Sequence, residues 1–178
     1  MKLLFSKEVI ARRIGQLAAR INRDYGERPV VLVVLLKGAQ LFAADLCRHL
    51  TCPVRLEFMR VCSYGAETAS SGCPRILLDL DEQLRDCHIL LVDDILDTGL
   101  TLHHLSRHLR QHQPASIRTC VLIDKYERRQ VAIAADYAAI ELQQGFVVGF
   151  GMDYNEQYRN LDAIYCLEAE DLAKESHP

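Results

Sequence analysis

His88 to Leu102 read HILLVDDILDTGLTL, and this stretch decides the fold. Its first part, Ile89 to Val92, is a short run of mostly branched apolar residues, which is typical of a strand buried in a parallel sheet. From Leu102 onward, leucines recur at three- and four-residue spacing, which predicts a helix. The segment from Asp93 to Thr101 is therefore expected to be a loop between a strand's carboxyl end and a helix's amino end, where open α/β sheets bind ligands.

The residues of this loop suit a phosphorylated sugar. Backbone N–H groups at a helix start lack internal partners, and the helix dipole adds partial positive charge, so a phosphate is favoured there. Gly99 allows close backbone approach or a positive φ, and Thr98 and Thr101 supply hydroxyl groups. Asp93 and Asp94 are hard oxygen donors for sugar hydroxyls or for Mg²⁺.

Asp97 is a third carboxylate in the same loop, placed where it could accept a proton. The loop has no lysine, so it does not fit the G-x-x-x-x-G-K-[ST] pattern of nucleoside triphosphate sites. An ordinary surface turn is the weaker interpretation, because three exposed acids so close together would repel one another without a cation or a hydroxyl ligand.

Composition limits the class of protein. At 178 residues and 49% hydrophobic content, residues 1–178 are expected to form one domain with a full core. Neither a membrane span nor a secretory signal is predicted, since no apolar run is long enough. Seven cysteines without a C-x-x-C pair indicate reduced thiols in a cytoplasmic protein. The net charge of −3 disfavours nucleic acid as the main partner. An intracellular enzyme or ligand-binding protein is expected.

Further elements are expected around the central strand. Their alternation predicts an α/β fold with parallel, right-handed connections. The strand over Pro53–Val61 is expected to point Val54, Leu56 and Phe58 inward and Arg55 and Glu57 outward. In chain order, we expect a helix from Ser6 to about Tyr25, a buried strand over Pro29–Leu36, a helix starting near Leu41, the strand over Pro53–Val61, and strands at Arg75–Leu80, Ser116–Ile123 and Ala163–Leu167.

Four separated motifs resemble those of the type I purine phosphoribosyltransferases, in particular the hypoxanthine(-guanine) phosphoribosyltransferases. The branched run, two acids and D-T-G-x-T resemble their signature for phosphoribosyl pyrophosphate (PRPP). Leu36 to Gly38 match an L-K-G pyrophosphate loop whose first peptide bond, here Leu36–Lys37, is typically cis. Ser63 to Gly65 match a flexible loop that closes over the active site. Gly145 to Leu161, GFVVGFGMDYNEQYRNL, nearly reproduce the segment F-V-V-G-[FY]-x-[LM]-D-Y-N-E-x-[FY]-R.

The resemblance implies both a fold and a reaction. The fold would be a central, mostly parallel sheet flanked by helices, with a small hood built from the terminal segments. The reaction would be that of purine salvage, in which a 6-oxopurine and PRPP give a nucleoside 5′-monophosphate and pyrophosphate. The implied cofactor is Mg²⁺, and the implied assembly is a homodimer or homotetramer, without nucleic acid or membrane partners.

The resemblance also implies roles for individual residues. Asp97 would accept the purine N7 proton, Lys125 would donate to the exocyclic oxygen, Phe146 would stack on the base, and Val147 would read the ring edge through its backbone. Arg129 falls at the spacing of a pyrophosphate-associated residue. The full implied sets are Leu36, Lys37, Gly38, Asp93, Asp94, Asp97, Thr98, Gly99, Leu100, Thr101 and Arg159 for PRPP, Ser63 and Tyr64 for the flexible loop, Lys125, Phe146, Val147 and Asp153 for the purine, and Asp93, Asp94 and Asp153 for metal.

The sequence departs from the family pattern at two positions. Asp93 stands where many members have glutamate, which makes direct contact with the sugar less certain. Leu100 replaces a lysine of some relatives, so the phosphate would depend more on backbone groups and on the threonines. Neither change removes the proposed base.

Three alternative interpretations were weighed. Xanthine-guanine phosphoribosyltransferases usually stack the base on tryptophan, and this chain has none. An RNA-binding regulator on the same fold, such as the pyrimidine-operon attenuation protein, has tyrosine where this chain has Asp97. His104, His108 and His112 could form a metal-binding column, but a solvated basic face is favoured because no acid or cysteine completes the set.

Overall fold

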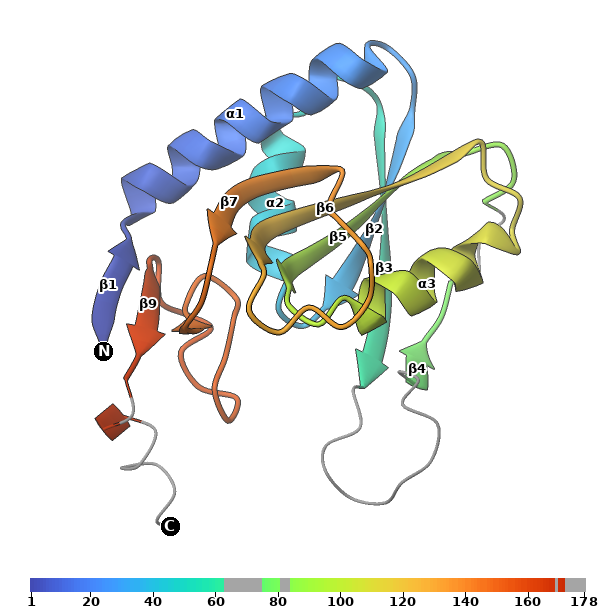
Figure 1. Ribbon diagram of the computed structural model, residues 1–178. Helices are drawn as coiled ribbons and strands as arrows, with labels where there is room; N and C mark the ends of the chain where they lie inside the picture. Colours follow the sequence, from blue (N-terminus) through green and yellow to red (C-terminus); the bar gives the residue numbers. More distant parts are fainter. Residues whose placement is uncertain (63–74, 81–83, 169, 172–178) are drawn as a thin grey trace.

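The computed structural model, which describes residues 1–62, 75–80, 84–168 and 170–171, is built around a six-stranded sheet (Figure 1). The strand order is β4-β3-β2-β5-β6-β7, and all neighbours are parallel except the β3–β4 pair. The expected α/β class is confirmed. The elements are β1 (Lys2–Phe5), α1 (Lys7–Tyr25), β2 (Val30–Leu36), α2 (Gln40–His49), β3 (Val54–Cys62), β4 (Arg75–Leu78), β5 (His88–Leu96), α3 (Leu100–Arg110), β6 (Ser116–Lys125), β7 (Tyr137–Leu142), β8 (Phe146–Val148) and β9 (Ile164–Leu167).

A second, three-stranded sheet joins the two ends of the chain. Its order is β1-β9-β8, and both of its pairs are antiparallel. The N-terminal ammonium group forms an ion pair with Asp171 at 2.7 Å. Figure 1 shows β1 and β9 side by side in this small sheet. It corresponds to the expected hood, although the sequence patterns did not predict β1, β7 or β8.

Helices cover both faces of the large sheet (Figure 1). On one face, Leu32 and Val34 of β2 join a buried cluster with residues of α1 and α2. On the other, Val33 and Leu35 join a cluster with the leucines of α3. Burial on both faces explains why β2 is apolar at every position rather than at alternate ones. No helix in the described part of the chain is long and apolar enough to cross a membrane.

The expected burial of β3 is wrong at two positions. Leu56 pairs with Leu32, and Phe58 pairs with Val34, so both side chains point to the face that α1 and α2 cover. Each is nevertheless 43% exposed. Met59, the fully buried residue of β3, lies on the opposite face with the leucines of α3, together with Glu57, so the expected inward and outward faces are wrong for this strand.

The expected loop from Asp93 to Thr101 is also partly wrong. β5 continues to Leu96, because its backbone stays paired with β6 as far as Leu96↔Asp124. Its pairing with β2 ends earlier, at Val34↔Val92. Asp93 and Asp94 therefore lie in a strand that has lost its neighbour on one side, and they face the residues that follow β2.

Candidate active site

A cavity of about 410 Å³ lies beyond the carboxyl ends of β2 and β5. Residues from three of the four sequence motifs meet in it. It also contains Arg60 and Glu156, which sequence reasoning did not assign. Glu156 stands in the quoted D-Y-N-E segment, so a signal for it was present, whereas Arg60 belongs to an ordinary strand pattern. The lining residues are Leu35, Leu36, Lys37, Gly38, Arg60, Val61, Asp93, Asp94, Thr101, Asp153, Glu156 and Arg159.

The Lys37-Gly38 turn lies against the acidic pair of β5. The Leu36–Lys37 peptide bond is cis, as the resemblance implied. A Cβ atom placed on Gly38 would lie 1.9 Å from Asp94 Oδ2, so only glycine lets these two segments approach so closely. The turn thus places one cation and its backbone beside two carboxylates.

Burial disfavours the ionised form of both carboxylates of the pair. Burial, together with the charge of Asp94, raises the pKa of Asp93 well above the ordinary carboxyl value. Burial also raises the pKa of Asp94. Each carboxylate accepts only the N–H of the residue after it, at 2.9 Å, among the hydrogen bonds described. A cation or sugar hydroxyl groups beside this pair would stabilise the ionised forms.

The donor set fits Mg²⁺ that is shared with a substrate. Mg²⁺ is usually held by one or two carboxylates plus phosphate oxygens and water, rather than by a complete protein cage. Within the described residues, no group of three or more His, Cys, Asp and Glu side chains could hold a metal ion. Asp153 is engaged by Arg159 at 2.8 Å and by the Glu156 N–H at 2.9 Å. Asp93 and Asp94 are thus the better placed ligands, and Asp153 would first have to release its partners.

Glu156 bridges two of the cations that line the cavity, Lys37 and Arg159. One of its oxygens lies 2.9 Å from Lys37 Nζ, and the other lies 3.5 Å from Arg159 Nη2. The hydrogen bond from Lys37 lowers the pKa of Glu156, so this carboxylate is ionised at neutral pH. Glu156 therefore occupies the cations to which pyrophosphate was assigned.

Replacing Glu156 with glutamine is expected to tighten pyrophosphate binding about two- to fivefold at pH 7, the range expected for exposed ion pairs. The glutamine keeps the size of the side chain but removes the competing charge. Because the pKa of Glu156 is lowered, the ion pair is lost only as the pH falls through that value, and the difference should shrink there. Calorimetric titration with magnesium pyrophosphate measures the effect. Glu27→Gln, an exposed carboxylate outside the cavity, is the control, and equal or weaker binding by Glu156→Gln contradicts the prediction.

The signature turn connects β5 to α3. Gly99 precedes the helix with φ of 84°, a left-handed conformation that glycine adopts without steric cost. The N–H of Leu100 donates to Thr98 Oγ1 at 3.4 Å. Thr101, in the first turn of α3, reaches the cavity. The turn therefore presents a helix amino terminus and a hydroxyl group at the edge where a phosphate would bind.

Asp97 has one occupied and one unpartnered carboxylate oxygen. Its Oδ2 lies 3.4 Å from Lys125 Nζ and 3.6 Å from an Arg128 guanidinium nitrogen. Its Oδ1 is buried and has no hydrogen-bond partner. Two cations therefore hold the carboxylate in place while one oxygen remains available to accept a proton.

Of the expected purine-binding residues, Lys125 lies next to Asp97 and also contacts Gly145, which directly precedes Phe146. Lys125 is 4% exposed and donates to the carbonyl of Gly145 at 3.2 Å. Phe146 is 37% exposed and meets Tyr154 edge to face, with 5.4 Å between ring centroids. Val147 is buried. An exposed aromatic ring near a buried ammonium group can bind a flat base that carries a carbonyl oxygen.

Several residues with expected roles do not line this cavity, among them Asp97, Lys125 and Phe146. The guanidinium group of Arg129 donates to carbonyl groups and to Asp124, so the pyrophosphate role implied for this residue is not supported. In the histidine column, His108 lies 2.9 Å from Asp79 and packs against His112. Ser63 and Tyr64 lie outside the residues that the structure describes.

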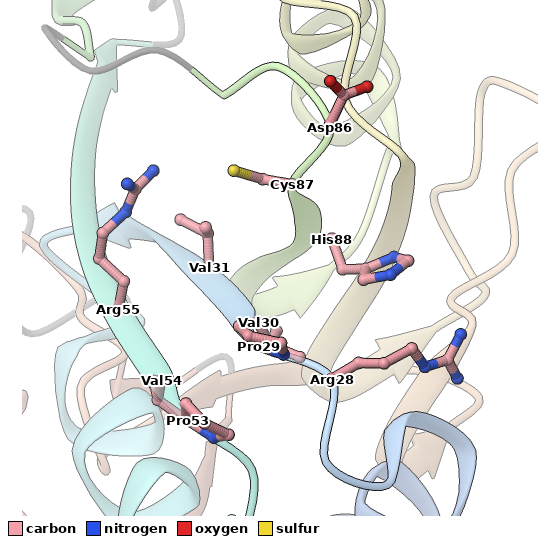
Figure 2. Close-up of a pocket in the computed structure, with 10 residues that line it drawn as sticks. All are labelled: Arg28, Pro29, Val30, Val31, Pro53, Val54, Arg55, Asp86, Cys87 and His88. Carbon is pink, nitrogen blue, oxygen red and sulfur yellow. The ribbon is translucent and has the colours of Figure 1, made fainter.

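A second cavity, of about 540 Å³, lies at the opposite edge of the sheet (Figure 2). It is lined by residues at or just before the amino ends of β2, β3 and β5, and Figure 2 shows the Cys87 thiol pointing toward Arg55 across it. None of the residues assigned from the sequence lines it. Since α/β sheets bind ligands at the carboxyl edge, the first cavity is the candidate active site.

Comparison with known proteins agrees with this fold. The sequence profile of the phosphoribosyl transferase domain matches residues 4–155 of this chain. That range includes Lys37, the signature turn and Phe146. The chain therefore belongs to the phosphoribosyltransferase family.

Its relatives define the branch of that family. The chain is 46% identical over 169 residues to the hypoxanthine-guanine phosphoribosyltransferase of Aquifex aeolicus, covering 94% of this chain and 95% of that protein. It is 41% identical over 172 residues to the protein of that name from Mycobacterium bovis, covering 93% and 85%. The hypoxanthine phosphoribosyl transferase of Trypanosoma cruzi superposes with a TM-score of 0.93 at 43% identity, covering 99% and 96%. The branch is that of the hypoxanthine-guanine phosphoribosyltransferases.

Proposed function

We propose that this chain is a pentosyltransferase of purine salvage that moves the phosphoribosyl group of PRPP to hypoxanthine, and also to guanine. The products are IMP or GMP and pyrophosphate. The observation that carries the proposal is the position of Asp97, which stands shortly before the amino terminus of α3 and whose Oδ2 lies 3.4 Å from Lys125 Nζ.

Each motif would act on one part of the reacting pair. The signature turn from Asp97 to Thr101 would hold the 5′-phosphate, and Asp93 and Asp94 would hold the ribose hydroxyls. Lys37, Gly38 and Arg159 would hold the pyrophosphate once Glu156 has moved aside. Mg²⁺ bound by Asp93 and Asp94, with Asp153 near a second ion, would neutralise charge on the leaving group.

The proposed reaction breaks one bond, forms one bond and moves one proton. The bond between the anomeric carbon and pyrophosphate breaks, and a bond forms between that carbon and a ring nitrogen of the purine. The proton on N7 passes to Asp97 Oδ1, while Lys125 donates a hydrogen bond to the oxygen at position 6. Phe146 orients the base by stacking.

A spectrophotometric assay with PRPP, Mg²⁺ and each of hypoxanthine, guanine, xanthine, adenine and uracil tests the proposal. We expect kcat/KM for adenine to be about 10²-fold lower than for hypoxanthine, because the Lys125 ammonium group only donates and adenine carries an amino group at position 6. Reactions without PRPP or with a chelator of Mg²⁺ are the controls. Transfer to no base contradicts the proposal, and xanthine used as well as hypoxanthine favours the xanthine-guanine alternative.

We also propose that the chain is cytoplasmic and acts as a homodimer or homotetramer. Free thiols at Cys47, Cys52, Cys87, Cys120 and Cys166 support a reducing compartment. The exposed Leu56 and Phe58 of β3 offer an apolar surface to a second copy. For the Trypanosoma cruzi relative, the C-terminal region has been studied for its role in oligomeric state and activity. Light scattering gives the molar mass, and a monomer at working concentration contradicts the proposed assembly.

A further inference from the structure

Arg129 is a largely buried arginine just after β6 that joins three separate segments. Its side chain is 15% exposed. Nε donates to the carbonyl of Asp97 at 3.0 Å, and Nη2 lies 3.1 Å from the carbonyl of Leu96. Nη2 also lies 2.9 Å from the carbonyl of Lys125, and Nη1 donates to the carbonyl of Ile133. One guanidinium group thus links the end of β5, the end of β6 and the connection to β7.

The segment that carries Arg129 also packs on the signature turn. The N–H of Gln130 donates to the carbonyl of Thr98 at 2.9 Å. A Cβ atom placed on Gly99 would lie 2.6 Å from Ile133 and 2.8 Å from Val131. Hydrogen bonds and close packing therefore both attach this connection to the turn that carries the proposed base.

The charge of Arg129 is balanced by Asp124, which no site motif includes. Arg129 Nη2 lies 2.5 Å from Asp124 Oδ1, and Asp124 is buried. A buried ion pair is weak evidence for stabilisation, because its desolvation cost offsets the Coulombic attraction. The planar fork of arginine can serve several acceptors at fixed angles, which a lysine ammonium group cannot do. The feature that requires arginine here is its set of carbonyl partners.

We propose that Arg129 is a positioning residue, which sets the distance between the proposed base Asp97 and the base-reading Lys125 by binding the backbone carbonyls of both. The inference rests on the proposed function, since it assigns this role for proton transfer from the purine. Arg129 does not line the candidate active-site cavity, and its guanidinium group is directed at backbone carbonyls and Asp124. Its loss should therefore impair turnover more than the binding of PRPP, whose pyrophosphate end is held at Lys37 and Arg159.

Arg129→Lys is the main test, because it keeps the positive charge beside Asp124 and removes the planar set of guanidinium N–H donors that bind the carbonyls. Misplacement of reacting groups by about 1 Å can cost about 10²-fold in rate, so we expect kcat to fall about 10- to 100-fold. KM for PRPP should stay within about threefold. The active-site concentration is measured by PRPP titration, so unfolded protein does not enter kcat. Arg118→Lys, which disturbs an arginine bound to Tyr137 and Asp24, is the matched control and should keep kcat.

A double variant separates positioning from stability. Arg129→Gln leaves Asp124 buried without its cation and should lower the melting temperature. Adding Asp124→Asn removes that charge and should restore the melting temperature in part, while kcat stays low.

Recovery of kcat together with the melting temperature, or Arg129→Lys within threefold of the wild type in kcat, overturns the positioning role. If the double variant does not recover its melting temperature, the kcat of Arg129→Lys alone decides whether Arg129 has a positioning role. A wild-type protein without transfer activity refutes the proposed function before any variant is compared.

Discussion

Replacing Asp97 with asparagine is expected to lower kcat about 10²- to 10⁴-fold, the usual contribution of a positioned general base. The amide keeps the size of the carboxylate and can still accept from Lys125, which lies 3.4 Å away. It cannot take up a proton at neutral pH. PRPP affinity should stay within about threefold, because in the proposed binding mode backbone groups of the turn and the hydroxyls of Thr98 and Thr101 hold the phosphate. Steady-state kinetics with hypoxanthine and calorimetric titration with PRPP measure the two quantities.

The matched control is Asp162→Asn, which removes a carboxylate that is 71% exposed and ion-paired with Lys7. It should leave both quantities unchanged. Equal activity of Asp97→Asn and the wild type would mean that the proton goes to another group. A loss of PRPP binding as large as the loss of turnover would mean that the Asp97 carboxylate serves the phosphate and not the base.

Replacing Gly151 with alanine is expected to lower the free energy of unfolding by about 2–4 kcal/mol, the combined range for backbone strain and overpacking. Gly151 has a φ of 99°, a backbone conformation that residues other than glycine rarely adopt. A Cβ atom there would lie 2.1 Å from the carbonyl oxygen of Gly38, and a backbone atom cannot move aside as a side chain can. The Lys37-Gly38 turn, which is proposed to bind pyrophosphate, would have to shift. PRPP affinity should therefore fall at least about tenfold. Urea unfolding and PRPP titration check the two effects.

The matched control is Gly15→Ala in α1. A Cβ atom on Gly15 meets no heavy atom within 4 Å, and alanine favours a helix interior by about 1 kcal/mol over glycine. This variant should be slightly more stable than the wild type and equally active. If Gly151→Ala unfolds at the same urea concentration as the wild type and binds PRPP equally well, close approach of Gly151 to Gly38 is not required.

The sequence predicted those elements whose residue pattern is local. The leucines of α3 and the continuous apolar run of β2 identified a helix and a doubly covered strand, and both are present. The end of β5 was misjudged, because Asp93 and Asp94 lack the apolar pattern and stay in the strand only through backbone pairing with β6. β1 was missed for a related reason: its four residues are held by pairing with β9 from the other end of the chain.

The candidate site divides in the same way. Lys37, Asp97 and Phe146 could be assigned from the sequence, because each stands in a contiguous motif whose residue types indicate its chemistry. The partner of Lys37 could not, since Glu156 lies 119 residues away in the chain. The direction of the Arg129 side chain was equally hidden, because arginine suits a solvent-exposed phosphate contact and a set of buried carbonyl partners alike.

By itself, the sequence determined the α/β class, the family resemblance and the residues of the signature turn, because hydrophobic period and motif spacing depend only on neighbours along the chain. Only the tertiary structure decided which surfaces are covered and which charges meet. It left Leu56 and Phe58 exposed on a face that is buried elsewhere. It also set the carboxylate of Glu156 between two cations and left one oxygen of Asp97 without a partner. Burial and ion pairing depend on segments distant in sequence, and no local pattern records which of them will be adjacent.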